Sequence, residues 1–209
     1  MTNGWSSMTG GMPDSMFERG QVPMTKEEVR SVVISKLRLH SDSTVVDIGA
    51  GTGSVSIETA LVCKSGIVHA IDKNDEAISL IRENAARFGV RNINIIKGTA
   101  PESLVHVGKA DRVFIGGSAG RLEAIFEWME VALSPGGRVV ANFITLENAA
   151  LMIRLLEESG YGDIDIVHMS VSRGRRIGGN TMMNAENGIY IISADRMSAT
   201  PRINSEDCK

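Results

Sequence analysis

The sequence has few of the residues that form disulfide frameworks, membrane spans or nucleic-acid surfaces. Only two of its 209 residues are cysteines, Cys63 and Cys208, which is too few for a disulfide framework or a metal-ligand cluster. No apolar run approaches the roughly 18 residues of a membrane span, and the N-terminus lacks the pattern of a secretory signal. The net charge of -3 supplies no basic field for a nucleic acid. We expect a cytoplasmic protein with neither a membrane nor a nucleic acid as partner.

The usual side-chain sets of nucleophilic and metal catalysis are also missing. The four histidines lie far apart along the chain, without metal-ligand spacing, and no serine–histidine–acid set stands out. We therefore expect structural histidines and no metal, and no catalytic side chain is predicted. The histidines are His40, His69, His106 and His168.

The clearest feature that is present is a β-branched run ending in an acid and three alternating glycines. Residues 44–48 predict a buried strand, and residues 54–64 predict the helix that follows. The glycines permit a tight turn and a close approach of a ligand, which the amides at the helix start would face. The pattern is typical of a nucleotide-binding loop. Its residues are Gly49, Ala50, Gly51, Thr52 and Gly53.

The acid in this stretch helps to separate classes of nucleotide. A dinucleotide fingerprint requires a glycine where Ser54 stands, so that match fails. Asp47, two residues before the first glycine, is a poor neighbour for a pyrophosphate and a good one for a cation. The alternative is a plain strand-to-helix turn in which Asp47 is a cap. Asp-x-Gly-x-Gly-x-Gly after a first strand resembles motif I of the class I S-adenosylmethionine (SAM) methyltransferases, whose loop wraps a sulfonium cofactor.

Strands and helices alternate along the rest of the chain, and a hairpin-like pair of strands closes it. This order predicts a doubly wound α/β fold with a seven-stranded mixed sheet, in a single domain over residues 12–196. Residues 1–11 are expected to be a flexible lead-in and residues 197–209 a polar tail. The expected strands cover residues 44–48, 67–71, 93–96, 111–115, 138–142, 164–172 and 188–193, and the later helices cover 74–88, 122–133 and 147–159.

Polar residues follow several expected strands, at the edge where parallel sheets bind ligands. Asp72 closes the second strand, where its carboxylate can accept hydrogen bonds from both ribose hydroxyls; the alternative is a helix N-cap. Gly117 and Ser118 follow the fourth strand and are candidate substrate contacts. Thr25, with Glu28 three residues later, forms a capping box that opens a helix. The same hydroxyl could serve a cofactor beside the glycine loop.

Taken in order, the motifs resemble one family. Gly-x-Pro-Asp-x-x-Phe, Val-Pro-Met-Thr-Lys-x-Glu-x-Arg, the glycine loop, Ile-Asp-Lys-Asn, Gly-Gly-Ser and Arg-Gly-Arg…Thr-Met-Met are similar to the decarboxylating precorrin methyltransferases of cobalamin biosynthesis. The resemblance covers about residues 11–193. It implies a Rossmann-like class I methyltransferase fold, SAM as cofactor and a homotetramer. It also implies methylation of carbon 15 of a precorrin or cobalt-precorrin, while the acetate arm on carbon 12 leaves as carbon dioxide.

The resemblance also assigns cofactor contacts. Carried over residue by residue, it implies that SAM is bound by Thr25, by the glycine loop 49–53, by Asp72, and by Thr99 and Ala100. The family commonly has an aspartate where this chain has Thr99. We therefore expect the adenine to be held by the Ala100 backbone and the Thr99 hydroxyl.

A precorrin carries many carboxylates, which calls for arginine side chains and backbone amides. Residues 173–176 hold the best local cluster of positive charge on this chain. We expect Arg173 and Arg175 to bind substrate carboxylates, while Gly178 and Gly179 let the loop fold over the ring. The alternative is a solvated hairpin tip or a contact between subunits.

Two other functions stay open at this point. An RNA or other small-molecule methyltransferase could use the same fold, because the site and not the fold decides function. An RNA enzyme would usually add a basic patch or a binding domain, and neither is visible beyond the arginine cluster. A non-catalytic SAM-binding subunit would keep the glycine loop and would need no segment for gripping a substrate.

Overall fold

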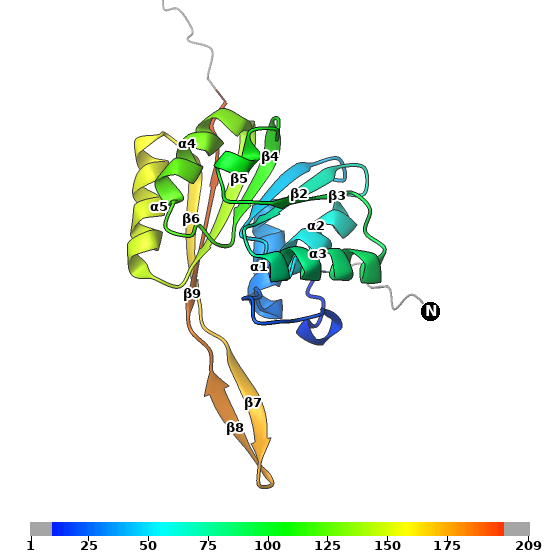
Figure 1. Ribbon diagram of the computed structural model, residues 1–209. Helices are drawn as coiled ribbons and strands as arrows, with labels where there is room; N and C mark the ends of the chain where they lie inside the picture. The colour runs from blue at the N-terminus through cyan, green and yellow to red at the C-terminus, as the bar shows by residue number, and fades with distance from the viewer. Residues whose placement is uncertain (1–9, 199–209) are drawn as a thin grey trace, which may run out of the picture.

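The computed structural model describes residues 10–198, which form a seven-stranded mixed sheet with helices on both faces (Figure 1). Its strands are β1 (Thr44–Ile48), β2 (Ile67–Asp72), β3 (Ile93–Lys97), β4 (Ala110–Ile115), β5 (Leu133–Phe143), β6 (Gly162–Met169) and β9 (Ile189–Asp195). The order is β3-β2-β1-β4-β5-β9-β6; the first five strands are parallel, and β9 is antiparallel to both of its neighbours. The predicted fold class is confirmed.

Two groups of helices cover the sheet. The helices are α1 (Glu27–Leu37), α2 (Ser54–Val62), α3 (Asp75–Phe88), α4 (Leu122–Ala132) and α5 (Leu146–Glu158), with short 3-10 helices η1 (Asp14–Met16) and η2 (Glu102–Leu104). Successive side chains of a strand point to opposite faces. In β5, Val139 and Ala141 accordingly pack with residues of α4 and α5, whereas Val140 packs with residues of α1. Among residues 10–198, no helix is long and apolar enough to span a membrane.

The ends of the expected domain lie close to the limits of the described residues. Positions 1–9 of the expected lead-in and 199–209 of the expected tail fall outside them. The amides of Gly11 and Met12 donate to the two carboxylate oxygens of Glu58, each at 2.9 Å. The folded part therefore includes Gly11, the last residue of the expected lead-in.

The N-cap of helix α1 lies one residue later than predicted. Lys26 occupies the N-cap position and makes no side-chain capping bond, so the predicted Thr25 capping box is wrong. The reason is a long-range contact of Arg30, whose side chain is fully buried. Its Nη1 donates to the Thr25 carbonyl (2.5 Å) and its Nε donates to Glu58 (2.6 Å). These bonds, and not a local cap, set how the chain enters the helix.

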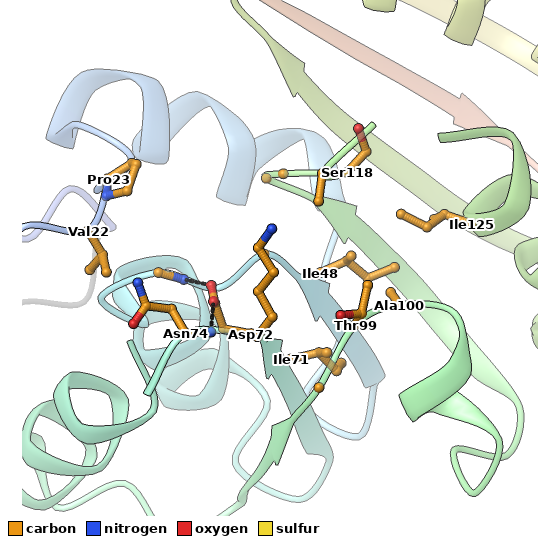
Figure 2. A pocket seen from close by; sticks show the side chains of 17 residues that line it. Val22, Pro23, Ile48, Ile71, Asp72, Asn74, Thr99, Ala100, Ser118 and Ile125 are labelled. Carbon is orange, nitrogen blue, oxygen red and sulfur yellow. Dashed lines mark hydrogen bonds between the residues drawn. The ribbon is translucent and has the colours of Figure 1, made fainter. Parts of the chain in front are cut away.

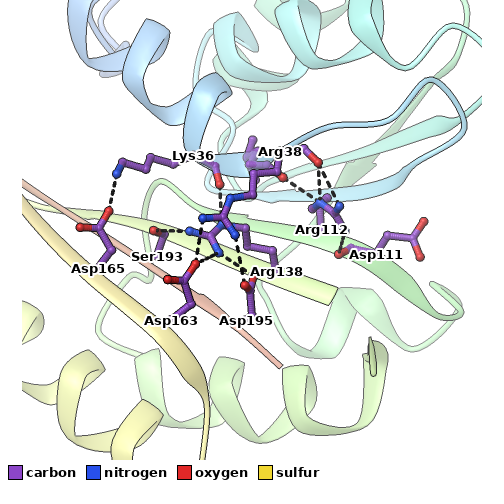
Figure 3. Close-up of polar contacts among 10 residues, drawn as sticks. Lys36, Arg38, Asp111, Arg112, Arg138, Asp163, Asp165, Ser193 and Asp195 are labelled. Atoms are coloured by element: carbon purple, nitrogen blue, oxygen red, sulfur yellow. Dashed lines mark hydrogen bonds and ion pairs between the residues drawn. The ribbon is translucent and has the colours of Figure 1, made fainter. Parts of the chain in front are cut away.

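The other end of α1 is held by two arginines of the sheet (Figure 3). Arg112 donates from Nε to the Leu37 carbonyl (2.7 Å), and Arg138 donates from Nε to the Lys36 carbonyl (2.6 Å). The last carbonyls of a helix have no partner within it, so side chains must satisfy them when they are buried. Arg138 also pairs with Asp195 (2.6 Å). These contacts lie at the amino edge of the parallel strands.

The expected loop at 173–184 is instead a β-hairpin, which corrects the prediction of a loop that folds over the substrate ring. Strands β7 (Ser172–Ile177) and β8 (Asn180–Ala185) pair along their whole length. The turn between them is Gly178-Gly179, with φ of 55° and 84°, as a tight two-residue hairpin turn requires. Every residue of β8 is exposed, and the hairpin projects away from the sheet (Figure 1).

A smaller difference concerns residues 134–137, a Ser-Pro-Gly-Gly stretch that predicts a turn between the helix expected at 122–133 and the strand expected at 138–142. It lies inside β5, where pairing with β4 jumps from Leu133 to Arg138. Gly136 adopts a positive φ of 76° there, and its amide donates to the Arg196 carbonyl (2.8 Å). The turn thus exists as a bulge within a longer strand.

Candidate functional site

A cavity of about 270 Å³ opens at the carboxyl edge of β1, β2 and β4 (Figure 2). The strand order reverses direction between β1 and β4, and ligands of open α/β sheets bind at such a point. One part of the wall is apolar, with the side chains of Ile48, Ile71 and Ile125. Another part is backbone, contributed by the glycine loop and by the loop after β4. A flat apolar group fits against the first part, and a polar chain against the second.

Close backbone contacts explain two of the loop glycines. Gly49 and Gly51 have positive φ values of 76° and 57°. A Cβ at Gly49 would lie 2.7 Å from the amide nitrogen of Gly117, and a Cβ at Gly51 would lie 2.5 Å from the carbonyl oxygen of Pro23. Both distances are too short for a side chain, so the loop tolerates only glycine there. The glycine loop is therefore packed between the β4–α4 loop and the segment before α1.

Asp72 lies in the cavity wall with its carboxylate already oriented (Figure 2). One oxygen accepts the amide of Gly51 (2.9 Å), and the other accepts the amide of Asn74 (2.9 Å). Each carboxylate oxygen can accept a second hydrogen bond, which leaves room for two ribose hydroxyls. The alternative role of Asp72 as the N-cap of α3 belongs to Asn74, whose side chain accepts the Glu76 amide (2.9 Å).

Asp47 does not face the cavity, which corrects the expectation that it lies beside a cationic ligand. Its neighbour Ile48 lines the cavity, and Asp47 points to the opposite face of β1, where it is 1% exposed. One oxygen accepts the hydroxyl of Ser56 (2.5 Å), and the other has no partner within residues 10–198. Burial raises the pKa of Asp47 to about 7, and the nearby charge of Asp72 adds to this while the Ser56 bond opposes it. Asp47 is therefore a buried partner of α2.

The other sequence-predicted contacts divide into two groups. Gly49, Gly51, Asp72, Thr99, Ala100, Gly117 and Ser118 line the cavity together. Ala50, Thr52, Gly53 and Thr25 are not among the lining residues; the hydroxyl of Thr52 is buried without a partner in the described part of the chain. The cavity is also lined by Val22, Pro23, Lys73 and Asn74, which are not predicted as contacts although they lie within the Val-Pro-Met-Thr and Ile-Asp-Lys-Asn motifs.

The two predicted substrate arginines lie on the hairpin, outside the cavity lining. Arg173 donates to Glu28 of α1 (2.5 Å) and to Glu186 (2.8 Å), and these carboxylates raise its pKa. Its guanidinium is thus occupied by the chain itself, which counts against a substrate role. Arg175 is exposed and makes no ion pair with residues 10–198. No cluster of three or more His, Cys, Asp or Glu within the described residues is arranged to hold a metal ion.

Comparisons with known proteins show which family this chain is similar to. The model of a precorrin methyltransferase domain matches residues 15–196. The cobalt-precorrin-6B C(15)-methyltransferase (decarboxylating) of Salmonella typhimurium is 43% identical over 186 residues, covering 88% of this chain and 96% of that one. A protein of Pyrobaculum calidifontis, named a probable enzyme of the same kind, is 45% identical over 193 residues, covering 91% and 98%.

Solved structures agree as well. The precorrin-6y C5,15-methyltransferase of Geobacter metallireducens has a TM-score of 0.84 at 36% identity, covering 89% of this chain and 98% of that one. The precorrin 8w decarboxylase of Methanobacterium thermoautotrophicum has a TM-score of 0.82 at 34% identity, covering 88% and 98%. With the glycine loop, Asp72 and the cavity at the strand-order reversal all in place, the chain belongs to the precorrin methyltransferase family.

Proposed function

We propose that this protein is a SAM-dependent C-methyltransferase that methylates carbon 15 of a cobalt-precorrin or precorrin, with decarboxylation of the carbon 12 acetate arm. The observation that carries the proposal is Asp72, oriented by two backbone amides in a cavity with apolar and backbone walls. Relatives named for this reaction align with nearly the whole chain. The proposal includes a cytoplasmic location, which fits a chain with only two cysteines.

The residues present fit SAM. Asp72 would bind the ribose, the apolar wall at Ile71 and Ala100 would contact the adenine, and the backbone of Gly49 and Gly51 would lie along the methionine part. When bound, SAM supplies an activated methyl group for an in-line displacement. The protein's part in such a reaction is to hold the two reactants in alignment and to exclude water. The methyl transfer itself requires no acid or base from the residues that line the cavity. When the carbon 12 arm loses carbon dioxide, its remaining carbon takes up one proton, and we assign no residue to that proton.

The substrate is proposed to enter beside the loop after β4. Gly117 and Ser118 lie there, with a backbone amide and a hydroxyl to offer. Lys73 also lines the cavity, and it makes no ion pair within residues 10–198. A polycarboxylate such as a precorrin is the kind of ligand that an ammonium group of this kind attracts.

The decisive experiment is anaerobic incubation of the protein with SAM and the cobalt-precorrin-6B substrate, followed by mass spectrometry. We expect the gain of one methyl group together with the loss of one carbon dioxide. Methyl gain alone would assign the decarboxylation to another step. An unchanged substrate, with SAM bound in calorimetry, would favour an RNA or small-molecule methyltransferase or a non-catalytic subunit, and failure to bind SAM would overturn the proposal.

Arg175 remains our proposed contact for a substrate carboxylate on the hairpin. Its replacement by alanine should raise the KM for the precorrin about ten- to a hundredfold, because a charge-assisted hydrogen bond contributes about 1.5–3 kcal/mol. The affinity for SAM should not change, since Arg175 does not line the cavity. An unchanged KM would assign the residue to the solvated hairpin or to a contact between subunits.

We also propose that the chain assembles into a homotetramer through the hairpin. The side chains of Ile177, Met182 and Met183 are 51%, 58% and 65% exposed on β7 and β8. An isolated two-stranded ribbon is at best marginally stable in water, and its open edges favour pairing with another chain. Replacing residues 174–183 by a two-residue turn should leave a folded monomer that still binds SAM, as measured by light scattering and calorimetry. A shortened variant with the mass of the wild type would contradict this.

A further inference from the structure

The cavity has a wall that comes from outside the sheet and its loops. Residues 11–23 precede α1, and their last members, Val22 and Pro23, line the cavity (Figure 2). The Pro23 carbonyl approaches Gly51 so closely that a Cβ there would lie 2.5 Å from it. The width of the cavity therefore depends on how residues 11–23 are held against the glycine loop.

One side chain of α3 contacts both of these walls. Asn84 is 0% exposed. Its amide nitrogen donates to the Thr52 carbonyl in the glycine loop (2.9 Å) and to the Glu18 carbonyl (3.2 Å), and its oxygen accepts the Glu18 amide (2.7 Å). One turn earlier on the same helix, Ile81 packs against Gly53, where a Cβ would lie 3.1 Å away. The face of α3 that carries Asn84 thus supports the loop directly.

Other hydrogen bonds hold residues 11–23, but they do not reach the loop. Glu58 accepts the amides of Gly11 and Met12 and pairs with Arg30, and Glu76 accepts the Gln21 amide (2.8 Å). Among residues 10–198, no other hydrogen bond joins residues 11–23 to the glycine loop. Because the Asn84 amide is buried, loss of its donors would leave the carbonyls of Thr52 and Glu18 unsatisfied. Within residues 10–198, Asn84 is therefore the hydrogen-bonding link between the two walls.

We propose that Asn84 is a positioning residue for the methyl donor: it joins the glycine loop to residues 18–23 and so sets the width of the cofactor cavity. It does not line the cavity, and it acts through the backbone of Thr52 and Glu18. This inference rests on the proposed binding of SAM in that cavity. It predicts that a change at Asn84 weakens SAM binding more than it slows the reaction of bound SAM.

The test compares two asparagines that make the same kind of contact. In Asn84→Asp, the amide donors are lost and the acceptor for the Glu18 amide is kept. The control is Asn92→Asp; Asn92 donates to the carbonyls of Ala60 (3.1 Å) and Cys63 (2.7 Å) at the far end of α2. We expect the Kd and KM for SAM to rise about tenfold in Asn84→Asp, with kcat at saturating SAM within about twofold of wild type. In Asn92→Asp the Kd should stay at the wild-type value.

Hydrogen exchange of the ligand-free proteins gives a readout that does not depend on SAM. Peptides covering residues 18–23 and 49–53 should both exchange faster in Asn84→Asp than in Asn92→Asp. If Asn84→Asp does not fold, Asn84→Ala removes the two donor bonds and also the acceptor for the Glu18 amide, without adding a charge, and the same results are expected.

The outcomes separate this inference from the proposed function. Wild-type SAM affinity in the Asn84 variants, or an equal loss in Asn92→Asp, would overturn the positioning role. If the wild-type protein itself does not bind SAM, the proposed function fails. In that case, hydrogen exchange decides whether Asn84 couples the two walls. Unchanged protection of the peptides covering residues 18–23 and 49–53 in the Asn84 variants would overturn that coupling.

Discussion

Two carboxylates near the glycine loop, Asp47 and Asp72, have opposite surroundings although each follows a run of β-branched and apolar residues. Asp72 ends its strand, is half-buried and accepts two backbone amides in the cavity wall. Asp47 lies one residue before the end of β1 and points away from the cavity into the packing of α2. At the residue scale, strand position decides which acid is available to a ligand. The difference leads to one prediction for each.

The Asp72→Asn variant should bind SAM about ten- to a hundredfold more weakly. The amide loses the charge, and its NH₂ group would oppose the amide of either Gly51 or Asn74; charged hydrogen bonds of this type contribute about 1.5–3 kcal/mol. Titration calorimetry measures the effect. The matched control is Asp75→Asn, because Asp75 is exposed and pairs with Lys97 at the surface (2.6 Å). Equal affinities of the two variants would contradict the ribose-binding role.

The Asp47→Asn variant should change how stability depends on pH. Burial raises the pKa of Asp47 from 3.8 to about 7 in the folded protein. Between these values the folded state binds more protons than the unfolded state, so this group makes stability fall as pH rises from about 4 to 7. The variant should lose that fall, which is on the order of 3 kcal/mol. Urea unfolding of both proteins at about pH 5 and pH 8 measures it, and parallel pH profiles would refute the assignment.

Helix α1 shows what holds an element whose own sequence signals are weak. Its start follows from Arg30 and not from a local cap, and its last carbonyls are satisfied by Arg112 and Arg138. Its buried face, with Val29 and Val33, packs on Phe114 of β4. At the element scale, Arg30 within α1 and two distant arginines of the sheet therefore fix the ends of α1, and α1 in turn holds the chain that leads to Pro23.

Replacing Arg138 by methionine should lower the free energy of unfolding by about 2–3 kcal/mol, because it leaves buried acceptors without donors. Its side chain is 2% exposed, whereas that of Arg38, which pairs with the same Asp163 and Asp195, is 57% exposed. Arg38→Met is therefore the control, with an expected loss below about 1 kcal/mol. Denaturant unfolding compares the two. A similar loss of unfolding free energy in both variants would show that the burial of Arg138 does not increase its contribution to stability.

At the scale of the whole molecule, the cavity joins parts that are far apart in the chain. The segment before α1, the glycine loop, the end of β2 and the loop after β4 all line it. The hairpin leaves the sheet after β6 and returns at β9, whose Tyr190 pairs with Phe143 at the carboxyl end of β5. It thus extends from the same edge of the sheet as the cavity. A ligand in the cavity contacts several of these parts at once and should stabilise the entire fold.

SAM at a hundred times its Kd should raise the free energy of unfolding by about 2.7 kcal/mol. For a chain of this size that corresponds to a rise in Tm of about 5–10 °C. Differential scanning calorimetry measures it. ATP serves as a control nucleotide, because it shares the adenosine part with SAM and carries a triphosphate in place of the methionine part that we assign to the glycine loop. The absence of any shift with SAM would contradict a SAM site in this cavity.

Much of the fold and part of the site follow from local sequence. The strands that flank the glycine loop, the loop itself and the position of Asp72 at a strand end are all visible in residue type and in periods of two or 3.6 residues. Local patterns are sufficient there because backbone conformation and burial repeat within a few residues. The hairpin shows where local patterns fail to predict structure. The Gly178-Gly179 pair is visible in the sequence, but the strands on either side of it are exposed and have no apolar periodicity that would predict them.

Contacts between distant residues decided everything else. Asp47 is bound by Ser56, which lies 9 residues away, and Arg173 pairs with Glu28, which lies 145 residues away. The start of α1 depends on Arg30, which bonds to Thr25 at a separation of 5 residues and to Glu58 at a separation of 28. Asn84 is unremarkable within its helix pattern, yet it joins Thr52 to Glu18 across 32 and 66 residues. No local period encodes such pairs, because they exist only when the chain has packed and a buried polar group must find its partner.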